Sequence, residues 1–216
     1  MKENADKNKS KRLVIYGILG AVTLAVVPFV VRLGKSFLGK ELPGNPEPGA
    51  VIFRDLGMGY CDHSGIYVGG GEKCIVELQN DSTTGHSIIR LVSPEVFVKN
   101  GYGNTRTIFA PARNGVPAGN PKVASTALSM VGQDLGKYSP LTNNCHMFSL
   151  SCLKAAESDE EFSVAKMQDL SRIPWKVLLT NLKMNAEEIL GANSWQIWNR
   201  EEQPVLGRNY PGPIPA

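Results

Sequence analysis

The chain has 216 residues, 42% of them hydrophobic, and a formal net charge of +3. This size fits one domain of ordinary length with extensions. Residues 1–42 hold eight Lys and Arg against three Asp and Glu, residues 43–157 hold nine of each, and residues 158–216 hold six against eight. Because the central region has no basic stripe, nucleic acid is an unlikely class of partner. The positive charge lies beside a hydrophobic segment, which favours a membrane surface as the partner.

The hydrophobic segment predicts a single transmembrane span. Leu13–Val31 holds nineteen residues without a charge, close to the roughly 20 that a helix needs to cross a hydrocarbon core. We expect a basic tail over 1–12, a transmembrane helix over 13–33 and a linker over 34–49. A cleaved signal peptide is the alternative, but Val30-Val31-Arg32 offers no small-residue cleavage site.

The side of the membrane that carries the rest of the chain stays open. Five basic residues precede the segment and three follow it, which weakly places the amino terminus in the cytosol. Cysteine usage points the other way. Cys61, Cys74, Cys145 and Cys152 form no C-x-x-C pair, so we expect free thiols, which favour a reducing compartment. We find no metal or nucleotide motif and expect no cofactor.

The central region, residues 50–157, predicts an α+β domain with an antiparallel sheet. Apolar and β-branched runs predict strands at Ala50–Arg54, His63–Val68, Cys74–Leu78 and Ser87–Val92. Gly101–Asn120 reads as irregular, with a short strand at Thr105–Phe109. Helices are expected at Pro121–Val131, with Leu128 and Val131 on its apolar face, and from Asn143 or Asn144 to about Ala156.

Residues 158–216 read as a helical extension with a disordered tail. Trp175, Leu178, Leu179 and Leu182 follow helical spacing, and Asn185 with Glu188 resembles a capping box that starts a second short helix ending at Gly191. Packing of this stripe on the domain is the preferred reading, and contact with a membrane or a partner is the alternative. The proline-rich residues 209–216 should be flexible.

Cys145 is the candidate nucleophile. If Asn143 or Asn144 caps the helix, Cys145 lies in its first turn, where the helix dipole and the free N–H groups favour a thiolate. A small buried core residue is the competing reading for any cysteine, and Cys152 fits that reading better. A thiol nucleophile needs a base and a group that orients the base.

His63 and Glu77 are the candidates for those two roles. If Val68 faces Cys74 across the glycine loop, residue 65 opposes residue 77, and Glu77 becomes a diagonal neighbour of His63 on one face. Glu77 interrupts an apolar strand, and a buried carboxylate requires a partner. His86 is a second candidate for orienting His63. Tyr67 shares the face of His63 and either lines a substrate site or packs in the core.

Four segments together resemble the lecithin:retinol acyltransferase-like family, which includes the H-Ras-like suppressor enzymes. They are Pro48–Arg54, His63–Gly69, Val131-Gly132-Gln133 with Tyr138, and Asn144–Phe148. The match covers about residues 43–157 in the family's order. The chain departs from the family at His146-Met147, where the family usually has Glu-His.

The resemblance implies a circularly permuted papain-like fold, with Cys145 as nucleophile, His63 as general base and Glu77 in the place of the family's third polar residue. It implies a membrane-anchored acyltransferase or phospholipase that attacks a lipid ester and forms an acyl-thioester. A cysteine peptidase or amidase of cell-wall peptides, and a non-catalytic interaction module, are the rival hypotheses. The altered residues at 146 and 147 give the second rival some weight.

Overall fold

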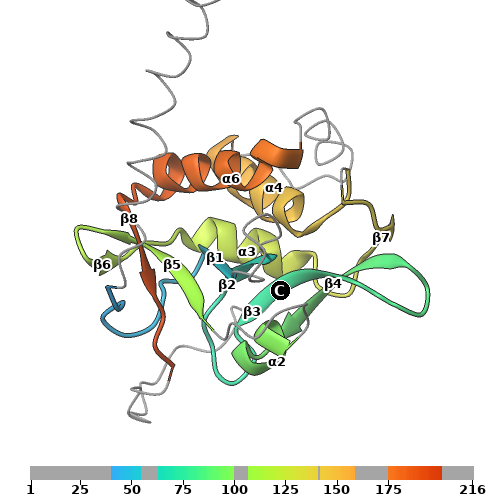
Figure 1. Cartoon of the computed structure of the whole chain (residues 1–216), viewed down its shortest axis with the longest axis horizontal. Coiled ribbons are helices and arrows are strands. Elements are labelled where there is room, and N and C mark those ends of the chain that lie inside the picture. The colour runs from blue at the N-terminus through green and yellow to red at the C-terminus, as the bar shows by residue number, and fades with distance from the viewer. Residues whose placement is uncertain (1–39, 55–62, 100–106, 141, 159–174, 201–216) are drawn as a thin grey trace, which may run out of the picture. The chain divides into compact units, whose positions relative to one another are not determined.

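The structure is a computed structural model that describes residues 40–54, 63–99, 107–140, 142–158 and 175–200 (Figure 1). The predicted transmembrane helix over 13–33, Cys61 and the predicted flexible tail over 209–216 lie outside the described residues. No helix within the described ranges has both the length and the apolar character needed to cross a bilayer.

An antiparallel sheet of eight strands forms the centre of the described fold. The strand order is β6-β5-β1-β2-β3-β4-β7, and β8 pairs with β5. The strands are β1 (Ala50–Arg54), β2 (His63–Tyr67), β3 (Ile75–Asn80), β4 (His86–Val92), β5 (Ile108–Arg113), β6 (Val116–Pro117), β7 (Asp134–Lys137) and β8 (Ser194–Ile197).

Helices cover both faces of this sheet, so the fold is α+β, as the sequence predicts (Figure 1). The larger helices α3 (Pro121–Ser129), α4 (Cys145–Ser158) and α6 (Trp175–Leu190) lie on one face, and the short helix α2 (Pro94–Lys99) lies against β3 on the other. The central strands are therefore buried on both sides, which explains why β1 and β2 are buried at every position.

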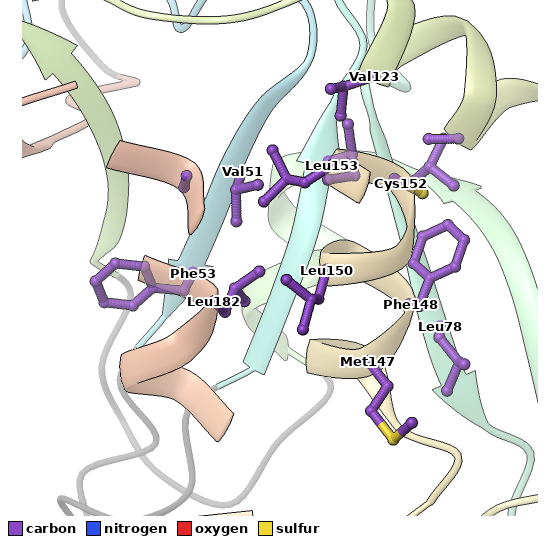
Figure 2. Close-up of a cluster of buried hydrophobic side chains, with 14 of the residues drawn as sticks. Val51, Phe53, Leu78, Val123, Met147, Phe148, Leu150, Cys152, Leu153 and Leu182 are labelled. Atoms are coloured by element: carbon purple, nitrogen blue, oxygen red, sulfur yellow. The ribbon is translucent and has the colours of Figure 1, made fainter. Parts of the chain in front are cut away.

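The main hydrophobic core lies between the sheet and the three larger helices. Figure 2 shows Leu150 and Leu153 of α4 directed at the sheet, with Leu182 of α6 beside Phe53 of β1. All four side chains are buried, and each fully buried apolar side chain of this size contributes about 1.5–3 kcal/mol. This packing fixes α4 on the sheet and so fixes where its first residue, Cys145, lies.

The predicted register of the β2–β3 hairpin is confirmed. Gly65 pairs with Glu77, and the Val68 N–H donates to the Cys74 carbonyl at 2.8 Å to close the loop. The loop turns through Gly69, Gly70 and Gly71, whose φ angles of 72°, 82° and 90° lie in the left-handed region that glycine adopts without strain.

Several predicted boundaries were wrong. The strand expected at 105–109 is β5, which runs from Ile108 to Arg113, and β6 follows it where irregular structure was expected. Residues 101–106 of the same prediction lie outside the described residues. The helix expected over 121–131 ends at Ser129, and Leu128 and Val131 are exposed instead of buried. The strands β7 and β8 and the helix α2 were not expected, because none of them has a long periodic pattern of its own.

The two helices expected after residue 174 are one continuous helix, α6. Asn185 does not cap a new helix there, since its side-chain amide donates to the Asn181 carbonyl one turn earlier at 2.8 Å. Beyond α6, β8 joins the sheet through β5, and Trp195 packs against Phe53 with ring centroids 5.1 Å apart. Elements beyond residue 157 therefore complete the same sheet and the same core.

Candidate active site

Cys145 is the first residue of α4, as the sequence predicts, and Asn144 caps the helix. The Asn144 Oδ1 accepts the backbone N–H of His146 at 3.0 Å and of Met147 at 3.1 Å, and the Asn144 carbonyl accepts the N–H of Phe148 at 3.1 Å. The Asn144 side chain thus occupies two of the four N–H groups that a helix start leaves open, and the bond from Phe148 is the first bond of the helix itself. The N–H of Cys145 belongs to the same four groups and lies at the start of α4.

The Cys145 thiol and the His63 imidazole come together where α4 and β2 both begin. The Cys145 sulfur interacts with the His63 ring and with the backbone N–H of Ser64, and both interactions favour the ionised form of the thiol. The two side chains are nearly enclosed, with Cys145 6% exposed and His63 9% exposed. A thiol and a base thus meet in a site that excludes most water, which strengthens the attraction between their charged forms.

Glu77 holds the other side of the His63 ring. The His63 Nε2–H donates to Glu77 Oε2 at 2.6 Å, which leaves Nδ1 of the ring for the sulfur. The Glu77 Oε1 accepts the Arg90 Nε–H at 2.8 Å and a second hydrogen bond from the same guanidinium. The carboxylate is fully buried, and both of its oxygens have cationic or N–H partners, as a buried charge requires.

Gly65 and Phe97 complete the support of the imidazole. Gly65 lies between His63 and Tyr67 on β2 and opposite Glu77 on β3. A Cβ atom at position 65 would lie 2.9 Å from the Val76 carbonyl oxygen and 3.1 Å from the Phe97 ring. The missing side chain therefore lets Phe97 of α2 pack over the strand, where its ring centroid lies 5.0 Å from that of His63.

The electrostatics of the site favour a thiolate and an imidazolium. Burial alone lowers the pKa of His63, but the charge of Cys145 and the hydrogen bonds to Cys145 and Glu77 outweigh burial and raise that pKa to about 9. Burial raises the pKa of Cys145, but the charge and hydrogen bond of His63 outweigh burial and lower it. Burial likewise opposes ionisation of Glu77, while His63 and Arg90 lower its pKa. Each ionised group is thus stabilised by the next one.

The sequence reasoning missed two basic residues that belong to this cluster. Arg90 of β4 lies opposite Glu77. Pairing Asn80 with Ser87 across the turn would have found it, because every later pair then follows from the antiparallel register. Arg54 of β1 lies opposite His63, is 1% exposed, and acts through its charge on both Glu77 and Cys145. Its only signal in the sequence was a charge at the end of an apolar strand.

The remaining histidines and Tyr67 have other partners. Tyr67 is buried and packs edge-on against Trp198, with ring centroids 5.3 Å apart, so its side chain belongs to the core. His86 is paired with exposed Asp134 at 2.7 Å, whereas Glu77 is the residue that binds His63. His146 points to Ser64, where its Nδ1 lies 2.9 Å from the hydroxyl oxygen.

The other described cysteines, Cys74 and Cys152, do not share the lowered pKa of Cys145. Cys74, Cys145 and Cys152 are free thiols. Burial raises the pKa of Cys74 to about 12 and also raises the pKa of Cys152. Of these three, Cys145 has the lowered pKa. Within the described ranges, no three His, Cys, Asp or Glu side chains form a group suited to a metal ion.

Comparisons with known proteins leave the chain without a matched relative. A scan against protein-family models gives no match, and neither does a search of curated proteins or of solved structures.

Proposed function

We propose that this protein is a thiol-dependent acyltransferase or hydrolase that carries the acyl group on Cys145. The observation that supports the proposal is the contact of one buried imidazole with a helix-start thiol on one side and a buried carboxylate on the other. A nucleophile, a base and an orienting group in this order are the parts of a nucleophilic acyl-transfer site. Cys152, a buried core cysteine of the same helix, has no such partners among the described residues.

The proposed reaction has two half-reactions. The Cys145 thiolate attacks the carbonyl carbon of an ester, a C–S bond forms, and the oxyanion lies against the N–H of Cys145 at the start of α4. Collapse of this intermediate breaks the C–O bond, and the His63 imidazolium gives its proton to the leaving alkoxide. Water, an alcohol or an amine then attacks the thioester, His63 accepts the proton of that nucleophile, and the thiolate leaves.

We propose a lipid ester, in particular a phospholipid, as the acyl donor. Support comes from the resemblance of the four motifs to the lecithin:retinol acyltransferase-like family and from the apolar segment over 13–33, which would raise the local concentration of a membrane substrate. The finer fold proposal is a circularly permuted papain-like domain. Its support is the chain order, in which the strands of His63 and Glu77 precede the helix of Cys145.

The test uses the full chain with phospholipid vesicles that carry a labelled acyl chain, compared with Cys145→Ala. We expect a hydroxylamine-sensitive acyl label on the wild type and none on the variant. Cys152→Ala is the matched control, since it removes a buried thiol that lies outside the site, and it should label normally. Labelling of Cys145→Ala, or no labelling of any protein, would count against the lipid acyltransferase.

A parallel assay of the same proteins with cell-wall peptide fragments tests the rival functions. Release of peptide from cell-wall fragments by the wild type, with inert vesicles, would assign a peptidase or amidase. A wild-type thiol that reacts with neither substrate, and that is alkylated no faster than an ordinary cysteine, would assign a non-catalytic module.

A further inference from the structure

The residue that departs from the family pattern, His146, is connected to the nucleophile through a buried serine. The Ser64 hydroxyl oxygen lies 2.9 Å from the His146 Nδ1 and 3.1 Å from the Ser149 hydroxyl oxygen. The same hydroxyl and the Ser64 backbone N–H both act on the Cys145 sulfur and lower the pKa of its thiol. Ser64 is fully buried, so water does not compete for these contacts.

Proton counting restricts how this network is arranged. A serine hydroxyl has one proton to donate and two lone pairs to accept with. Ser64 has three partners, so it donates to one and accepts from two. A thiolate can only accept, whereas an imidazole N–H and a second hydroxyl can both donate. When Cys145 is ionised, one arrangement satisfies every partner. In it the Ser64 hydroxyl donates its hydrogen bond to the sulfur and accepts hydrogen bonds from His146 and Ser149.

We propose that His146 is a positioning residue. Its Nδ1–H donates to the oxygen of the Ser64 hydroxyl, and the Ser64 O–H is thereby oriented to donate a hydrogen bond to the Cys145 sulfur. His146 then acts on the nucleophile through Ser64 and not as a general base, although it is adjacent to Cys145 in sequence. The contribution to catalysis rests on the proposed function, but the effect on thiolate formation does not depend on the substrate.

Other charges around the sulfur set the background for this effect. Arg54 of β1 and His63 of β2 face Cys145, and Glu77 of β3 and Arg90 of β4 act on it through the His63 ring. All four remain in place when position 64 or 146 is changed, so a change in the thiolate can be assigned to the serine network.

The test measures the rate of alkylation of Cys145 by iodoacetamide against pH in the full chain, with the modified peptide identified by mass spectrometry. In Ser64→Ala the backbone N–H remains but one donor is lost, so we expect the midpoint of the profile to move up by about one pH unit, the worth of a hydrogen bond to a charged group. His146→Leu should give a similar shift, and the double variant should shift no further. His146→Asn, which keeps an N–H donor near the Nδ1 position, should restore the wild-type midpoint.

Ser151→Ala is the matched control, because it removes a buried hydroxyl of α4 that has no hydrogen-bond partner among the described residues. Thermal unfolding of each variant shows whether it is folded. The proposal is overturned by an unchanged midpoint in folded Ser64→Ala or His146→Leu, or by additive shifts in the double variant. If the wild type takes up no acyl label from lipid, the proposed function is refuted. The alkylation result still stands in that case, since alkylation needs no acyl donor.

Discussion

At the scale of single residues, Glu77 links the whole charge cluster. One oxygen of its buried carboxylate binds His63 and the other binds Arg90. The first contact fixes Nε2 of the ring on Glu77, so that the other nitrogen, Nδ1, is left for Cys145. The second contact neutralises a charge that would otherwise be too costly to bury. The His63 ring is thus held in one orientation before a substrate arrives.

Replacing the carboxylate by an amide tests this role. Glu77→Gln keeps the size of the side chain but removes the negative charge that supports the imidazolium, and we expect kcat/KM for acyl transfer to fall by about 10²–10⁴-fold. Glu95→Gln is the control, because Glu95 is largely exposed at the surface and lies outside the site. Steady-state kinetics on both variants would contradict the role if Glu77→Gln retained wild-type activity.

The raised pKa of His63 predicts the alkaline limit of activity. His63 titrates at about 9 in the folded protein, above its ordinary value of 6.5, so the imidazolium persists through neutral pH and is lost as the pH rises through about 9. Because the imidazolium protonates the leaving group, kcat/KM should decline over that range, while its acid limb follows formation of the thiolate. A pH–rate profile that stays flat from pH 7 to pH 10 would refute this assignment.

The same pKa should depend on the thiolate. Among the causes that raise the pKa of His63, the charge of Cys145 is the largest, and burial opposes all of them. In Cys145→Ala the burial remains while that charge is gone. We therefore expect the NMR titration midpoint of the His63 ring to fall below about 9. An unchanged midpoint would mean that Glu77 alone sustains the imidazolium.

At the scale of elements, α4 places the nucleophile through its cap. Asn144 accepts two N–H groups with its side chain and also donates its amide to the Pro140 carbonyl at 2.9 Å, and Asn143 donates to the Leu135 carbonyl of β7 at 2.9 Å. These bonds join the helix start to the chain that precedes it. The position of Cys145 therefore depends on β7 as well as on its own helix.

Removing the cap should loosen this end of the helix. Asn144→Ala is expected to lower the free energy of unfolding by about 1 kcal/mol, the usual worth of an N-cap, and to slow alkylation of Cys145 at neutral pH. Asn144→Ser keeps an acceptor and should recover most of both. Urea unfolding and alkylation rates measure the two effects. Equal stability in the Ala and Ser variants would show that the cap contributes nothing.

Whether a feature could be predicted from the sequence depends on how far apart its residues lie along the chain. The cap of α4 and the register of the β2–β3 hairpin depend on residues close in sequence, so the helix start at Cys145 and the position of Glu77 relative to His63 could be predicted. Arg54 reaches the site through the pairing of β1 with β2, and β8 joins β5 from far along the chain. Such pairings leave no local periodicity to read, and neither does a two-residue strand such as β6.

At the scale of the whole described fold, the last two elements are part of the structure that supports the site. β8 pairs with β5 along Phe109–Ala112, and β5 pairs in turn with Arg54, the residue opposite His63. Leu182 of α6 and Trp195 of β8 are buried in the same core as α4. The sheet and the nucleophile helix thus share one core with residues beyond 157.

A chain that ends at residue 157 should therefore fail to fold cooperatively. It would expose the β5 edge and the Phe53 side that Trp195 covers, and loss of one such buried aromatic residue typically costs about 3–5 kcal/mol, a large part of the roughly 5–15 kcal/mol that stabilises most domains. A chain that ends at residue 200 is the matched control, because it keeps every contact described above. Thermal unfolding followed by circular dichroism should show a cooperative transition for the longer chain and none for the shorter one. Cys145 in the shorter chain should be alkylated with the pH profile of an ordinary thiol. A cooperative transition at an unchanged temperature in the shorter chain would show instead that the sheet and α4 form an independent domain, to which α6 and β8 are only attached.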